Sequence, residues 1–340
     1  MKPPRVLFVI PGDGEGCSMV FARRQAETLV QRGLAEVEVF HLRSRTAPHV
    51  LWRESRRFRA HLRTFRPDIV HAHFGTMTAA FAAALSTDVP LMITFRGSDL
   101  NKVPMASGLR PALGHLLSQL AALRAAWMVC VSRGLREQLW WKRKCATVLP
   151  SGVDTDAFQP MPQAEARAAL GWPEEGRVVL FNAGHDPVNK RLDLALAAVQ
   201  EAARTIADLR IEVVSGQVAP ELMPLYMNAA DCLLVTSDAE GSPTVVQEAL
   251  VTELPVVSVN VGDIQDRLRG ISPSAIATRD PHMLAEALCT VLAAGRRSNG
   301  RSRVREICST HIADELAHLY RQVIATRHPG RIPTWSTTHS

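Results

Sequence analysis

The stretch Ser237-Asp-Ala-Glu-Gly-Ser-Pro-Thr-Val-Val-Gln-Glu-Ala-Leu250 predicts both an α/β fold and a ligand site. It follows an apolar, strand-like run and contains two carboxylates, Glu240 and Glu248, eight positions apart. Ser242 is a good helix N-cap, and Pro243 suits the first helical position, where a backbone N–H is not needed. We therefore expect a helix to begin between the two glutamates.

The start of this helix would carry unpaired N–H groups, which attract anions such as phosphate. Glu248 lies five residues beyond Pro243, about 7.5 Å along the axis at about 1.5 Å per residue. This is the kind of distance that separates a diphosphate from the ribose of a nucleotide. Glu240 precedes the helix, where a sugar attached to the same phosphates would lie. The segment predicts a sugar-nucleotide site; the alternative is an amphipathic helix with two solvated glutamates.

Length and composition indicate a globular chain with two domains, since 46% of its 340 residues are hydrophobic. No apolar run reaches the length of a membrane span, and Met-Lys-Pro-Pro-Arg5 leads into a strand pattern rather than a signal peptide. The six cysteines lack metal-type spacing, and several lie in apolar runs that are typical of buried thiols. We therefore expect a reduced, cytoplasmic protein.

The net charge of +6 favours anionic partners. Six arginines and one acid are interleaved with aromatic and aliphatic residues between Trp52 and Arg66, and Trp140-Trp-Lys-Arg-Lys144 repeats the pattern. These segments predict either solvated outer helices or a surface that binds an anionic membrane. Nucleic acid is disfavoured as a partner because the chain has only two tyrosines and no recognisable binding motif.

Short apolar runs alternate with helical patterns along the chain, which predicts parallel sheets covered by helices. The predicted strands are Arg5–Pro11, Val37–Leu42, Asp68–Phe74, Pro90–Arg96, Trp127–Ser132, Cys145–Pro150, Val178–Ala183, Arg210–Ser215, Asp231–Thr236 and Pro255–Val261. The alternation breaks at Gly152–Glu175. We therefore expect one Rossmann-like domain over residues 1–155, a second over 156–326, and a flexible tail over 327–340. Ligands bind at the carboxyl ends of such strands.

A glycine-rich turn, Pro11-Gly-Asp-Gly-Glu-Gly16, follows the first strand. A dinucleotide fingerprint would require glycine at the next position, where the chain has Cys17, and an acidic residue after the second strand, where it has His41-Leu-Arg43. Nicotinamide binding is therefore disfavoured. Gly14 and Gly16 are instead expected to let the backbone approach a ligand in the crevice between the domains.

Two further strand ends carry polar side chains. His71 and His73 have no apparent third metal ligand, and we interpret them as structural or crevice-lining residues. Thr94-Phe-Arg-Gly-Ser-Asp99 carries a charge on each side of Gly97, which indicates either ligand contact or an internal Arg96–Asp99 ion pair.

The second half begins with two candidate sites. Asp154 and Asp156 have the residue types that hold a divalent ion, but they fall in the expected turn between the domains, and we do not predict a metal there. Asn182-Ala-Gly-His-Asp-Pro-Val-Asn-Lys190 ends the first strand of the second domain. Lys190 precedes a helix and is placed to meet a phosphate as a point charge, with Gly184 and His185 as additional donor contacts.

Together these elements resemble the retaining glycosyltransferases of the two-domain GT-B fold, in the large family (glycosyltransferase family four, or glycosyl transferases group 1) with a Glu-x7-Glu signature. The resemblance covers nearly the whole chain and is strongest over Pro220–Asp263. Leu225–Asp231, Glu240–Pro243 and Leu254–Ser258 are similar to the family's donor-binding half, and Leu149–Phe158 resembles its interdomain segment.

The resemblance implies roles for the candidate residues. Glu240 would contact the donor sugar, Glu248 the ribose, and the amides around Pro243, Thr244 and Val245 the phosphates. The family's Arg-x4-Lys phosphate pair aligns with His185 and Lys190, and its His-Gly-x-Asp motif appears here as Arg96-Gly-Ser-Asp99. In these two departures, a histidine replaces an arginine and an arginine replaces a histidine.

The implied activity is metal-independent transfer of a hexose or N-acetylhexosamine from a nucleoside diphosphate, such as a UDP-sugar, to an acceptor hydroxyl with retention of configuration. No cofactor is implied beyond the donor. We expect a lipid-linked or surface-polysaccharide acceptor and a protein peripheral to the inner face of the membrane. Three alternatives remain open: a small natural-product acceptor, a sugar-nucleotide epimerase using His71, His73 and Asp99, and a non-catalytic partner subunit.

Overall fold

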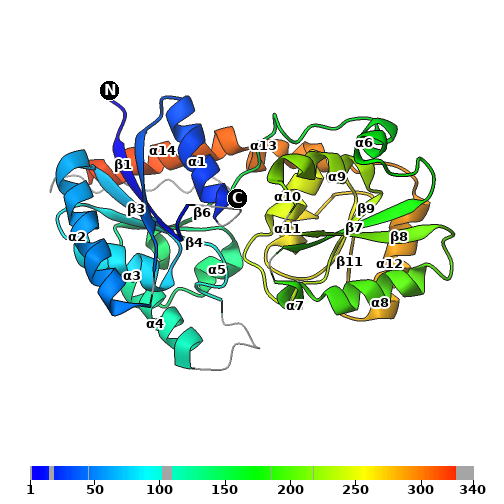
Figure 1. Cartoon of the computed structure of the whole chain (residues 1–340), viewed down its shortest axis with the longest axis horizontal. Helices are drawn as coiled ribbons and strands as arrows, with labels where there is room; N and C mark the ends of the chain where they lie inside the picture. Colours follow the sequence, from blue (N-terminus) through cyan, green and yellow to red (C-terminus); the bar gives the residue numbers. More distant parts are fainter. Residues whose placement is uncertain are drawn as a thin grey trace.

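A computed structural model gives the arrangement of the chain (Figure 1). The structure describes residues 2–14, 19–44, 46–101, 109–184, 186–216 and 218–326. Two parallel sheets lie side by side, each covered by helices, and this confirms the predicted α/β GT-B fold class.

The first sheet has the strand order β2-β1-β3-β4-β5-β6. Its strands are β1 (Arg5–Pro11), β2 (Glu36–Leu42), β3 (Ile69–His73), β4 (Leu91–Phe95), β5 (Trp127–Cys130) and β6 (Ala146–Val148). Its helices are α1 (Val20–Gln31), α2 (Pro48–Phe65), α3 (Thr76–Leu85), α4 (Leu109–Arg124), α5 (Arg133–Glu137) and η1 (Arg143–Cys145). Strands β3 and β4 are buried throughout, as expected for a parallel sheet with both faces covered.

The second sheet has the order β11-β10-β9-β7-β8. Its strands are β7 (Arg177–Gly184), β8 (Leu209–Ser215), β9 (Cys232–Val235), β10 (Val256–Val259) and β11 (Ala275–Ala277). The helices of this half are α6 (Gln163–Leu170), α7 (Pro187–Lys190), α8 (Leu192–Ala202), η2 (Pro220–Leu222), α9 (Met223–Ala229), α10 (Thr244–Val251), α11 (Ile264–Arg267), α12 (Pro281–Ala293), η3 (Gly300–Arg303), α13 (Val304–Ile307) and α14 (Ser309–Ala325). Sequence reasoning missed β11, a three-residue edge strand without a long apolar run.

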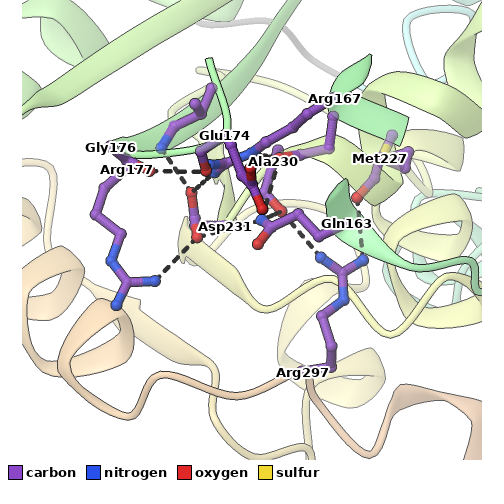
Figure 2. Close-up of polar contacts among 11 residues, drawn as sticks. Gln163, Arg167, Glu174, Gly176, Arg177, Met227, Ala230, Asp231 and Arg297 are labelled. Atoms are coloured by element: carbon purple, nitrogen blue, oxygen red, sulfur yellow. Dashed lines mark hydrogen bonds and ion pairs between the residues drawn. The ribbon is translucent and has the colours of Figure 1, made fainter. Parts of the chain in front are cut away.

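Helix α6 lies within the segment Gly152–Glu175, and a buried ion pair fixes it to the second domain (Figure 2). Arg167 Nη2 contacts Asp231 Oδ2 at 2.9 Å, and its Nε donates to the carbonyl of Ala229 at 3.1 Å. Arg177 reaches the other oxygen of Asp231 at 3.1 Å. The segment is therefore not a free linker, because its helix is part of the second domain's packing.

The final helix, α14, packs on the first domain, although we had assigned residues 156–326 to the second. Leu316 and Tyr320 lie in one buried cluster with Phe8 of β1 and Ala22 of α1. Tyr320 Oη is 2.7 Å from Nδ1 of His71. The predicted division is therefore wrong for α14, because an apolar helix face can pack against either sheet and the sequence pattern does not specify which.

Candidate active site

The two domains touch where the loops after β4 and β9 meet. A Cβ on Gly241 would lie 2.0 Å from the carbonyl oxygen of Arg96, so the two backbones approach at a distance that only glycine permits. Nearby, Asn101 Nδ2 donates to the carbonyl of Glu240 at 2.9 Å. Predicted site residues from the two halves of the chain therefore lie together.

Lys190 and Glu240 form an ion pair at this junction, with Nζ and Oε1 2.5 Å apart. Lys190 ends α7, while Glu240 lies between β9 and α10. Backbone contacts hold the two segments together: Asp238 N donates to the carbonyl of Asn189 at 2.8 Å, and Thr236 Oγ1 donates to that of Lys190 at 2.8 Å. Both charged side chains are partly exposed.

Helix α10 begins at Thr244 with Pro243 in the N-cap position, so the prediction of a Ser242 cap and Pro243 as first helical residue is wrong. Ser242 Oγ instead donates to Asp263 Oδ2 at 2.8 Å and accepts from Gln247 Nε2 at 3.0 Å. The serine turns inward because these neighbouring polar groups are buried. No side chain caps α10, and the first amides of the helix keep the capacity to bind an anion.

Glu248 lies one turn into α10 and lines a pocket shared by the two domains. The opposite wall is helix α1, with Phe21, Arg24 and Gln25. Burial raises the pKa of Glu248 to about 7, and the positive charge of Arg24 acts in the opposite direction. Sequence reasoning missed Arg24 and Gln25, although helical spacing places both on the face of α1 that carries Phe21.

The guanidinium of Arg96 is held by the first domain. It donates to Ser151 Oγ and contacts His73 Nδ1, both at 2.9 Å, and it lies 4.2 Å from the ring centre of Phe21. Burial lowers the pKa of Arg96 to about 9. The side chain forms no ion pair with Asp99, so that alternative is wrong.

Asp99 organises the loop that carries Arg96. Its carboxylate accepts from the amides of Gly75 and Gly97, each at 2.8 Å, and from that of Arg96 at 3.0 Å. Burial raises the pKa of Asp99, while these amides oppose the shift. With both oxygens occupied by backbone donors, Asp99 has a structural position, whereas ligand contact was one of the two alternatives expected for it.

The two histidines of β3 are fully buried, in agreement with a structural interpretation. His71 contacts Tyr320 Oη and Thr94 Oγ1, both at 2.7 Å. The ring of His73 lies 4.0 Å from that of His71. Burial lowers the pKa of both imidazoles well below the ordinary value.

Two of the predicted glycines can be located. Gly14 has a φ of 94°, and a Cβ there would lie 2.8 Å from His41 Nε2. Gly184 has a φ of 53°, and its amide donates to Asn182 Oδ1 at 2.9 Å. Both positions have left-handed backbone that favours glycine. The predicted contacts Gly16 and His185, and the tail 327–340, lie outside the described residues.

The segment between the domains forms a turn, as expected. Asp154 Oδ1 accepts from the amides of Asp156 and Ala157 at 3.0 and 3.1 Å. Across the described ranges, no group of three or more histidine, cysteine or acidic side chains is arranged to hold a metal ion. No helix in those ranges is long and apolar enough to cross a bilayer.

Two family models match the two halves of the chain. Residues 17–157 match Glycosyltransferase Family 4, and residues 174–294 match Glycosyl transferases group 1. Together the matches support a GT-B glycosyltransferase of the family-four type.

One curated relative is TuaC of Bacillus subtilis (strain 168), whose name assigns it provisionally to teichuronic acid biosynthesis as a glycosyltransferase. It is 29% identical over 248 residues, which are 66% of this chain and 61% of TuaC. The chain thus spans less than two thirds of the length of this relative.

Solved structures share the fold. Sucrose-phosphate synthase from Thermosynechococcus elongatus has a TM-score of 0.80 and 19% identity, covering 95% of this chain and 100% of that one. Anabaena HepE, solved in complex with UDP and glucose, has a TM-score of 0.73 and 15% identity over 94% and 100% of the two chains.

Proposed function

We propose that the protein is a glycosyltransferase that moves a sugar from a nucleoside diphosphate to an acceptor hydroxyl with retention of configuration. One observation carries this proposal. The Lys190–Glu240 pair and Glu248 lie on either side of the uncapped start of α10, where the two domains meet.

The proposed roles follow from the charges at this site. The ammonium of Lys190 and the first amides of α10 would stabilise the departing diphosphate, and His185 is the candidate for a further donor. Glu248 would accept hydrogen bonds from the ribose, and Glu240 from hydroxyls of the sugar. On binding, the phosphates would compete with Glu240 for Lys190, which frees the carboxylate for the sugar.

The comparisons support the choice of substrates. HepE has been solved with UDP and glucose, and the name of TuaC refers to a cell-surface polymer. We therefore propose a UDP-sugar donor carrying a hexose or N-acetylhexosamine, and an acceptor in the synthesis of a surface or lipid-linked glycan. Departure of the diphosphate and attack of the acceptor on the same face of the sugar would retain the configuration.

The structure favours this activity over epimerisation. An epimerase requires acid–base groups that face the sugar, and His71, His73 and Asp99 were the candidates. His71 is occupied by Tyr320 and Thr94, and Asp99 by three backbone amides. The hydrogen bonds of His71 and Asp99 therefore favour the transferase, and His73 contacts the guanidinium of Arg96 through Nδ1.

Incubation with radiolabelled UDP-, GDP- and ADP-sugars tests the proposal. A transferase, given an acceptor glycan, releases free nucleoside diphosphate and labels the acceptor, and NMR of the product reports its anomeric configuration. Interconversion of sugars with the nucleotide intact would identify an epimerase instead. Absence of both reactions together with bound donor would identify a non-catalytic subunit.

A further inference from the structure

Helices α2, α3 and α4 cover the same face of the first sheet and share one buried core (Figure 1). Within α2, the segment that we expected to dock on a membrane, Phe58 and Phe65 are buried in this core, and Leu62 packs against it. Trp52 remains exposed, at 64%. Most apolar side chains of α2 therefore face the core and are not available to a membrane. The interpretation of α2 as a mixed basic and apolar docking surface is wrong in this respect.

Helix α4 instead presents an apolar stripe to solvent. Its members alternate by four and three positions and are between 40% and 86% exposed: Leu109, Leu113, Leu116, Leu120 and Leu123. This spacing places them on one helix face over about 21 Å, at about 1.5 Å per residue. We call this set the leucine stripe. Trp140, 50% exposed, packs beside it against His115 of α4, with ring centres 5.3 Å apart.

The opposite face of α4 is fixed to the rest of the domain. Ser118 Oγ donates to the carbonyl of Asp99 at 2.6 Å, and Gln119 accepts from Trp140 N at 3.1 Å and from Trp141 Nε1 at 2.7 Å. The leucine stripe is thus held outward by specific hydrogen bonds. The Ser118 contact also joins α4 to the loop that carries Arg96 in the candidate active site.

The exposed charged residues of α4 itself are Arg110 and Arg124, and the nearest exposed acidic residues, Asp88 and Glu137, lie outside the helix. The exposed charged residues of these three helices are all arginines: Arg53, Arg56, Arg59, Arg63, Arg110 and Arg124. Their acidic residue, Glu54, is 1% exposed and pairs with Arg57 at 2.9 Å. A second copy of the chain would bring like charges together, and nucleic acid offers no partner for a row of leucines. An anionic lipid surface matches both the apolar and the charged components.

We propose that the leucine stripe and Trp140 insert into the surface of an anionic bilayer, with the arginines of α2 facing the lipid headgroups. This inference goes beyond the proposed function, and vesicle binding can be measured without any sugar donor. Because Ser118 ties α4 to the Asp99 loop, docking would hold the crevice close to the membrane, where a lipid-linked acceptor would be presented.

The test is co-sedimentation of the full chain with vesicles of phosphatidylcholine, with and without phosphatidylglycerol. Wild-type protein is expected to bind the anionic vesicles preferentially. The affinity of the triple variant Leu113→Glu, Leu116→Glu, Leu120→Glu for these vesicles should fall more than about ten-fold. The glutamates remove apolar side chains that the membrane would bury, and the anionic headgroups repel them. A matched control places glutamate at similarly exposed apolar positions of the second domain, Leu196, Leu222 and Met283. This control should bind like wild type, and circular dichroism verifies the fold of both variants.

Three results would overturn the inference. The first is equal binding of wild type and the α4 variant, and the second is equal loss in the control variant. The third is absence of wild-type binding to either vesicle. In the third case, light scattering decides whether the stripe joins two copies: a wild-type dimer that the α4 variant dissociates would identify a second chain as the occupant.

Discussion

Glu248 combines a candidate ligand-binding role with a poorly solvated position. Its carboxylate lines the pocket between the domains, and burial brings its pKa to about 7. An ionised carboxylate accepts hydrogen bonds from ribose hydroxyls about twice as strongly as a protonated one, which has lost part of its acceptor capacity. The binding of nucleotide should therefore depend on pH in a range where exposed glutamates do not titrate.

We predict that nucleotide affinity falls as pH is lowered from about 8 to about 6, approaching ten-fold per pH unit well below the pKa. The sign follows from the raised pKa, since protonation below about 7 removes the stronger acceptor form. Calorimetric titration of UDP across this range measures the effect, with Glu248→Gln as the variant whose profile should be less steep, because it keeps only the titration of the nucleotide's own phosphate. A wild-type profile equal to that of Glu248→Gln would remove Glu248 from the site.

Lys190 is the described cation best placed for the leaving group. We predict that Lys190→Ala lowers kcat by about a hundred-fold to a thousand-fold, because one preorganised donor to the developing charge is lost. Lys144, exposed in η1 of the first domain, provides a control in Lys144→Ala. Steady-state release of nucleoside diphosphate measures both. An unchanged kcat in Lys190→Ala would assign the Lys190–Glu240 pair to structure alone.

The sequence predicted which residues come together better than it predicted their individual contacts. Glu240, Lys190 and the start of α10 lie together as expected because strand ends of parallel sheets converge at one edge. The inward turn of Ser242 and the amide contacts of Asp99 were missed. Both depend on buried polar partners, such as Asp263 and Gly75, that are distant in sequence.

The loop after β4 depends on one side chain. Because Asp99 accepts hydrogen bonds from three backbone amides, Asp99→Asn would set an N–H₂ group against N–H donors. We predict a loss of about 1–3 kcal/mol in the free energy of unfolding, the usual cost of unsatisfied buried donors. Urea unfolding measures it, with Asp88→Asn at an exposed position as control. Equal stability of the two variants would contradict the structural role.

Helix α14 anchors the end of the described chain to the first sheet. Tyr320→Phe removes the hydrogen bond to His71 while keeping the ring, and we predict a loss of about 1–2 kcal/mol in stability. The chain's other tyrosine offers the matched control Tyr226→Phe, which should change stability little. If both variants melt like wild type, the buried chain of contacts from Arg96 to Tyr320 does not contribute to stability.

The strands and their order in the chain were predictable because each buried strand is a short apolar run between turns. The sequence did not predict which apolar face of each outer helix is covered by its neighbours. Helix α2 has aromatic residues that pack inward, whereas α4 has leucines that stay outside, and both have the same 3.6-residue periodicity. Only the position of the neighbouring helix decides which apolar face is covered.

In the molecule as a whole, the pocket that Glu248 lines has walls from both domains, with Arg24 of α1 among its first-domain residues. The diphosphate charge would be met by Lys190 and the first amides of α10, without a bridging metal ion. We predict that donor turnover persists after exhaustive treatment with EDTA. Nucleoside diphosphate release with and without added Mg²⁺ or Mn²⁺ measures this. Complete loss of turnover that either ion restores would revive Asp154 and Asp156 as candidate ligands.

The most direct test is calorimetric titration of the full chain with UDP, GDP and ADP. The predicted result is that one of them binds wild-type protein. Glu248→Ala should weaken this binding by roughly ten-fold to a hundred-fold, the cost of a charge-assisted hydrogen bond. The exposed control Glu286→Ala should bind like wild type. If none of the three nucleotides binds, or if Glu248→Ala binds as tightly as wild type, the start of α10 is not a donor site.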